Sequence, residues 1–96
     1  MGRTRTSAFD AADYLKDHGS MVAYLEAALD DGEPGVIAAA LGDIARAKGM
    51  TQVAKDTGLG RESLYKALAP GANPEFATIL KVVQALGMSL HARPCG

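Results

Sequence analysis

The sequence has little cysteine, no tryptophan and no long apolar run. Cys95 is its single cysteine and there are two histidines, so neither an internal disulfide nor a closed zinc site can form. No apolar run approaches the roughly 20 residues that cross a bilayer. Acidic residues also interrupt the start of the chain, where a signal peptide would be apolar. We therefore expect a cytoplasmic protein without structural metal or membrane contact.

Groups of side chains suited to catalysis are also absent. Ser63 has no neighbouring histidine to act as a base, and Lys55 and Lys66 are not accompanied by a glycine-rich phosphate loop. His91 has no ligand partner at a suitable spacing, and His18 is expected at a helix end, where an imidazole favours the helix dipole. The sequence predicts that the protein is not an enzyme and needs no cofactor.

Charge of neither sign is in excess over the whole chain, whose formal net charge is −1. This balance argues at first against a nucleic-acid partner, because such proteins usually carry a basic excess. The two halves differ, however. Residues 1–45 contain three Lys or Arg against eight Asp or Glu, a net of −5, whereas residues 46–96 contain seven against three, a net of +4.

Helical spacing of apolar residues is present along most of the chain and predicts one all-α domain of five or six helices. Its expected limits are residues 9–92, with a flexible basic N-terminus at 1–8 and a flexible tail at 93–96. In the first half, we expect Ser20 to cap a helix that ends at Gly32. The next helix then begins at Pro34, carries an apolar stripe from Val36 onward and ends at Gly49.

The last predicted helix has Asn73 as its cap and Pro74 as its first residue. Its apolar stripe begins at Phe76, and Gly87 ends it. The stretch 88–92 alternates with period two, which is typical of a short strand or an extended tail.

Residues 51–68 have the spacing of a helix-turn-helix. Thr51 is the expected cap of the first helix, and Ala54 is small enough to let the second helix approach closely. Gly58 follows four residues later and supplies the left-handed turn, and Leu64 then anchors the second helix. An ordinary helical hairpin with a solvated polar face is the alternative, but the basic second half of the chain favours a DNA-binding pair.

The second helix of this pair has two distinct faces. At about 100° per residue, Leu64, Ala67 and Leu68 share its inner arc. The outer face carries side chains that read base edges or hold phosphates in a major groove. Tyr65 is expected either to contact phosphate or to pack across Pro70. The candidate DNA-binding residues are Thr51, Gln52, Arg61, Glu62, Ser63, Tyr65, Lys66 and Asn73, the last as a helix cap or as a phosphate contact.

Six stretches carry a likeness to a known family, namely 13–17, 24–29, 40–46, 58–68, 73–76 and 80–87. Through them the sequence closely resembles the addiction-module antidote proteins, phage-repressor-like (Xre/HigA-like) antitoxins of type II toxin–antitoxin pairs. The likeness covers residues 8–92. Phage repressors carry a glutamine four residues before the small alanine, whereas Gln52 precedes Ala54 by two, so the phosphate-contact role of that glutamine transfers only weakly to Gln52.

The resemblance implies a lambda-repressor-like fold, a homodimer that binds double-stranded operator DNA of its own operon, and neutralisation of a small basic RelE-like ribonuclease toxin. The acidic half then acquires a role, because it would attract a basic toxin. Simple solvation of Asp30, Asp31 and Glu33 remains the alternative. Two other functions stay open, namely a stand-alone transcriptional regulator without a toxin and a helical protein-interaction module.

Overall fold

The structure, a computed structural model, describes residues 11–95. This part of the chain forms a short 3-10 helix and five α-helices, so the all-α prediction is confirmed. It contains no strand, and the stretch 88–92, predicted as a strand or an extended tail, is an extended tail. The flexible segment predicted for residues 1–8 lies outside the described residues. The elements are η2 (Ala11–Tyr14), α2 (His18–Asp31), α3 (Pro34–Lys48), α4 (Met50–Thr57), α5 (Arg61–Ala67) and α6 (Phe76–Ala85).

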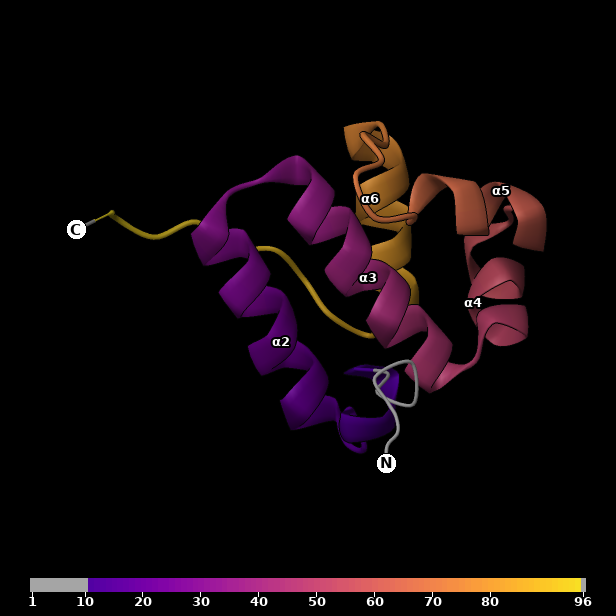
Figure 1. The fold of residues 1–96 in the computed structure, drawn as a ribbon, viewed down its shortest axis with the longest axis horizontal. Helices are drawn as coiled ribbons and strands as arrows, with labels where there is room; N and C mark the ends of the chain where they lie inside the picture. The colour runs from indigo at the N-terminus through magenta and orange to yellow at the C-terminus, as the bar shows by residue number, and fades with distance from the viewer. Residues whose placement is uncertain (1–10, 96) are drawn as a thin grey trace, which may run out of the picture.

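Helix α3 is central and contacts η2, α2, α4 and α6. Helices α2 and α3 run antiparallel as a hairpin, whereas α4 and α5 lie together at the opposite end of the molecule (Figure 1). After α6 the chain turns back in extended form toward α2. The α2–α3 hairpin and the α4–α5 pair thus present two separate surfaces.

The core lies between these helices and draws side chains from all five of them. Leu25 of α2 and Met50 of α4 are buried at its edges. Each fully buried side chain of this size contributes roughly 1.5–3 kcal/mol of transfer free energy. The largest fully buried side chains are Leu41, Ile44, Val53, Leu64, Val82, Val83 and Leu86.

Helix α2 starts earlier than predicted. Asp17, rather than Ser20, is its N-cap, and the Asp17 Oδ1 atom accepts a hydrogen bond of 2.7 Å from the Ser20 backbone N–H. Aspartate is among the strongest capping residues, so the helix extends upstream to this position. His18 therefore lies in the first turn of α2, and its predicted place at the C-terminal end of a helix is wrong.

Two other predicted caps are also wrong. Helix α4 begins at Met50, which is buried, so Thr51 lies within the first turn and Gly49 is the N-cap. Helix α6 begins at Phe76 with Glu75 as its N-cap, and no side chain caps it. The connection from α5 therefore continues through Asn73 and Pro74 before the helix starts.

The ends of the predicted apolar stripes also differ from the structure. Val36 is 45% exposed and Phe76 is 67% exposed, although both fit the helical spacing of core residues. Both lie in the first turn of their helix, at the rim of the core. Periodicity identifies the face of a helix that points inward but not the point along the helix where the core ends.

Candidate nucleic-acid interface

Helices α4 and α5 are joined by a turn of three residues. Gly58 has φ +78°, in the left-handed region, and its N–H donates to the carbonyl oxygens of Ala54 at 3.0 Å and Lys55 at 3.3 Å. A residue with a side chain would pay roughly 1–2 kcal/mol for this conformation. The predicted role of Gly58 is confirmed, and it sets the direction in which α5 leaves α4.

Buried side chains hold the two helices together. Ala54 is 6% exposed on α4, and Leu64 and Leu68 are 0% and 4% exposed at α5. The small Ala54 side chain lets α5 approach closely, and Leu64 anchors the middle of α5 in the core. Ala67, the third residue predicted on this arc, is half-buried. The arrangement is compatible with a helix-turn-helix.

Thr57 also fixes the turn, although the sequence reasoning assigned it no role. Its Oγ1 donates to the Ala54 carbonyl oxygen at 3.0 Å and accepts from the Leu59 backbone N–H at 3.2 Å. Threonine hydroxyls commonly bond to nearby backbone in this way. A threonine directly before a helix-ending glycine was the available signal.

The eight predicted DNA-binding side chains are all exposed. Five of them come from the seven residues of α5, so they share one short helix. The other three lie on different segments, because Thr51 and Gln52 belong to the first turn of α4 and Asn73 lies in the connection to α6. Within residues 11–95, no hydrogen bond or ion pair joins these three to the α5 group. The α5 group is Arg61, Glu62, Ser63, Tyr65 and Lys66.

Two of the polar side chains on this face are held by a neighbour one turn away. The Arg61 guanidinium lies 5.8 Å from the centroid of the Tyr65 ring, and its Nη2 donates to the Tyr65 hydroxyl at 3.5 Å. Gln52 Nε2 donates to Asp56 Oδ1 at 2.8 Å. Asp56 was missed in the sequence, although the i,i+4 spacing of a glutamine and an acid signals such a pair.

Tyr65 is 46% exposed, and the contacts that the structure gives it are with Arg61 rather than Pro70. An arginine over an aromatic ring at an exposed site gains about 0.5–1 kcal/mol. The ring therefore restrains Arg61 at the N-terminal end of α5.

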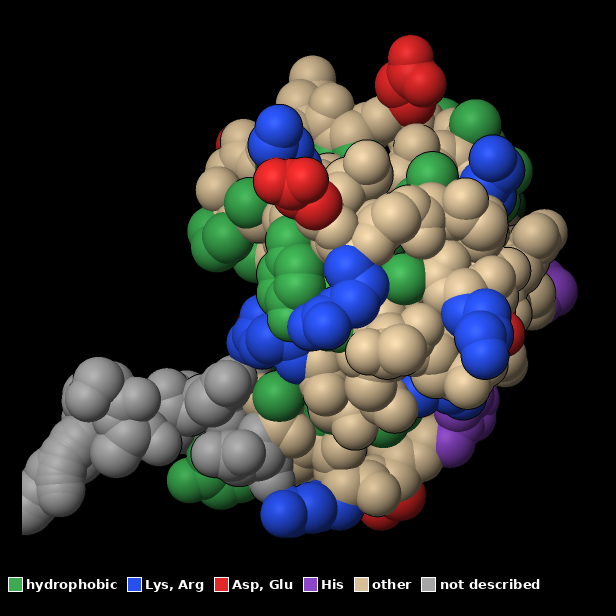
Figure 2. Space-filling view, turned by 90° about the vertical axis from the view of Figure 1, so that its right-hand side faces the viewer, with side chains coloured by type: hydrophobic (Ala, Val, Ile, Leu, Met, Phe, Trp, Pro, Cys, Tyr) green, Lys and Arg blue, Asp and Glu red, His purple; other side chains and the backbone are tan. Residues whose placement is uncertain are grey.

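Cations surround this helix pair. Lys48, Lys55 and Lys66 are exposed together with Arg61. Seen from the α4–α5 side of the molecule, Lys and Arg side chains are spread over the face and are more prominent than Asp and Glu (Figure 2). Such a surface suits a polyanion, because the contacts that neutralise phosphates need distributed positive charge.

Other kinds of site find no support in the described residues. Within residues 11–95, no three His, Cys, Asp or Glu side chains are grouped so that they could hold a metal ion. None of the helices there has the length and apolar character needed to span a bilayer. The exposed polar face of α4–α5 remains the candidate interface.

Comparison with known protein sequences identifies the family of this chain. A family profile described as a probable addiction module antidote protein matches residues 5–94. An uncharacterised protein of Haemophilus influenzae is 44% identical over 85 residues, which cover 88% of each chain. No solved structure matches the chain. The match over nearly the whole length shows that this chain belongs to the family of probable addiction module antidote proteins.

Proposed function

We propose that this protein is an antitoxin that neutralises a RelE-like ribonuclease toxin and represses its own operon by binding double-stranded DNA. Family membership supports the antitoxin role. The single observation that carries the DNA-binding role is the outward face of α5, where five of its seven residues are polar and exposed on a helix anchored by Leu64.

Helix α5 would enter the major groove as in a lambda-repressor-like domain. Arg61 would bind guanine through O6 and N7, and Glu62 would accept a hydrogen bond from cytosine. Ser63 and Lys66 would contact phosphates or base edges beside them, and the Tyr65 ring would hold Arg61 in place for its contact. Thr51 and Gln52 at the start of α4, together with Asn73, would contact the phosphate backbone and so fix the position of α5.

A homodimer would provide two such helices. Helix-turn-helix dimers read two half-sites about 34–36 Å apart, which is one turn of DNA. One α5 helix of seven residues reaches few base pairs, so a single copy would discriminate operator from other DNA poorly. We therefore expect a two-fold symmetric operator and two copies of the chain on it.

The test is binding of the purified protein to DNA from directly upstream of its own reading frame, with a scrambled duplex of equal length as control. Fluorescence anisotropy at several salt concentrations should give a linear fall of log affinity against log salt, with a slope near −0.9 per phosphate contacted. A flat salt response, or equal affinity for the scrambled duplex, would refute DNA-specific repression.

Two other functions are separated by further observations. A stand-alone regulator would bind the same DNA but would have no small basic reading frame beside its own. A protein-interaction module would lose no activity when Arg61 and Lys66 are replaced by alanine. Growth rescue on co-expression with the product of the neighbouring frame tests the antitoxin role directly.

A further inference from the structure

The α2–α3 hairpin has an unbalanced charge. Residues 17–45 contain no lysine or arginine but six acidic residues, and the two cations of the hairpin, Arg46 and Lys48, lie in the last turn of α3, where Arg46 pairs with Asp43. Helix α2 lies on the side of α3 away from α4 and α5 (Figure 1), whereas α3 itself contacts α4. Four of the six acids are exposed at the middle and end of α2 and in the turn that follows it, namely Glu26, Asp30, Asp31 and Glu33.

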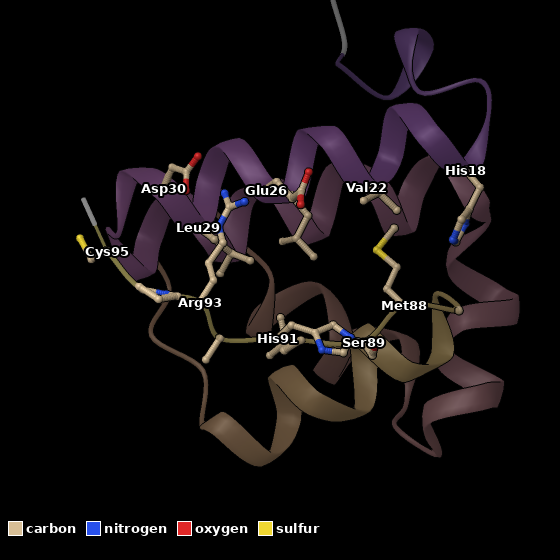
Figure 3. A pocket seen from close by; sticks show the side chains of 15 residues that line it. His18, Val22, Glu26, Leu29, Asp30, Met88, Ser89, His91, Arg93 and Cys95 are labelled. Carbon is tan, nitrogen blue, oxygen red and sulfur yellow. Dashed lines mark hydrogen bonds between the residues drawn. The ribbon is translucent and has the colours of Figure 1, made fainter.

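A groove runs between α2 and the extended C-terminal segment. It has a volume of about 1090 Å³ and is lined by α2 on one side and by residues 87–95 on the other. The side chains of Val22, Glu26 and Leu29 point from α2 toward this segment (Figure 3). Leu29 is 40% exposed there. We call this feature the α2–tail groove; its α2 wall is apolar with an acidic edge formed by Glu26 and Asp30, and Arg93 lines it from the opposite wall.

The opposite wall offers a backbone without partners. Met88 donates its N–H to the Val83 carbonyl oxygen at 3.0 Å, and beyond it no backbone–backbone hydrogen bond holds the described residues up to Cys95. Met88 and Leu90 nevertheless pack against the core, which fixes the segment in place. An extended, anchored segment with unpaired N–H and C=O groups can accept a strand from a partner.

We propose that the α2–tail groove is the docking surface for the toxin, which would place a basic, extended segment in it. The inference rests on the proposed antitoxin function and adds the location of the toxin contact. Lysine or arginine side chains of that segment would meet Glu26 and Asp30, and its apolar side chains would contact Val22 and Leu29. Charge complementarity of this kind raises the rate of encounter and fixes the orientation of the partners.

A second copy of this chain fits the groove less well than a basic partner. Two copies meeting at this surface would bring together four carboxylates, Glu26 and Asp30 of each copy, but only two arginines, Arg93 of each, so negative charge would remain in excess, and like charges at an interface are unfavourable. The position of the groove has a further consequence. Because it lies away from α5, a bound toxin would leave the DNA-binding face open.

Charge reversal at the groove tests the inference. The product of the neighbouring reading frame, identified by mass spectrometry, is the probe, and its Kd for immobilised full-length protein is measured at low and high salt. We expect E26K to weaken binding and E26K/D30K to weaken it on the order of tenfold or more at low salt, mainly through slower association. The matched control for E26K is E75K, which makes the same single charge reversal at an exposed residue outside the groove.

The possible outcomes have distinct meanings. Equal affinity of wild type and E26K/D30K, with unchanged thermal melts, would overturn the groove assignment but leave the antitoxin role in place. Equal weakening by E75K would also overturn it, because overall charge would then account for the effect. A change of oligomeric state in E26K/D30K, seen by light scattering, would instead assign the groove to a second copy. Failure of the wild-type protein to bind the probe would refute the antitoxin role and the inference together.

Discussion

Gly42 of α3 lies directly against the carbonyl oxygen of Leu68, so that a Cβ atom on Gly42 would be only 2.7 Å from that oxygen. Real Cβ atoms do not come this close to backbone, so a side chain here would push the end of α5 away from α3. We predict that Gly42→Ala lowers the free energy of unfolding by about 1–2 kcal/mol, since overpacking outweighs the gain in helix propensity. Urea denaturation followed by circular dichroism measures it.

Gly19→Ala is the matched control for this effect. Gly19 is also helical, is exposed, and its added Cβ would meet Asp17 Oδ1 at an ordinary 3.4 Å. This variant should be as stable as the wild type or more stable, by up to about 1 kcal/mol. Equal stability of the two alanine variants would contradict the close approach of α3 and Leu68.

Asp17 makes the start of α2 sensitive to acid. The hydrogen bond from the Ser20 backbone N–H holds the pKa of the Asp17 carboxyl below its ordinary value. Stability from this cap is present above the unfolded pKa of about 3.9 and is lost as pH falls through the lower folded pKa. We predict that Asp17→Ala lowers Tm at pH 7 and that its deficit shrinks on acidification below about pH 4.

Asp17→Asn separates capping from charge. Asparagine caps helices about as well as aspartate but does not titrate. The Tm difference between Asp17→Asn and Asp17→Ala should therefore stay nearly constant from pH 7 to pH 3. If that difference declines in parallel with the wild-type advantage as pH falls, the acid sensitivity does not come from titration of Asp17.

The turn between α4 and α5 could be predicted from the sequence because it depends on local requirements. The left-handed backbone angle of the turn requires Gly58, and the helical spacing of buried residues requires Leu64. Both requirements can be recognised in the sequence. The caps were harder to predict because several candidates compete. Asp17 and Ser20 are both good N-caps, and the sequence alone does not say that Asp17 is the one that caps α2. The exposure of Phe76 likewise depends on where the neighbouring helices end.

The α2–tail groove could not be predicted from the sequence. Its walls come from two segments separated by more than 50 positions, and no periodicity or motif links Glu26 to Met88. The charge asymmetry was visible in the sequence, but the sequence does not show that two of the acids line a groove. Pairing of an extended segment with a distant helix is a tertiary property, which depends on how α6 returns the chain toward α2.

Tyr65 should act on DNA binding through Arg61. The ring lies under the guanidinium at 5.8 Å, whereas the hydroxyl contact of 3.5 Å is long for a hydrogen bond. We predict that Tyr65→Phe keeps operator affinity within about twofold, because the ring still restrains Arg61. Tyr65→Leu should lose about two- to fivefold, the equivalent of an exposed cation–π contact. If Tyr65→Phe loses as much as Tyr65→Leu, the hydroxyl itself contacts the DNA.

Arg61 and Lys66 should differ in how they support binding. Both are exposed on α5, but Arg61 lies at its first residue and can bind a guanine with two hydrogen bonds, whereas Lys66 offers a single point charge suited to phosphate. Lys66→Ala should weaken operator and scrambled DNA alike and make the salt slope less negative by about 0.9. Arg61→Ala should weaken the operator by about 1–3 kcal/mol more than the scrambled duplex. Lys16→Ala removes an exposed cation between η2 and α2, outside the α4–α5 pair, and should change neither affinity. Anisotropy titrations of the three variants measure these effects, and an equal loss on both duplexes from Arg61→Ala would show that Arg61 does not read a base.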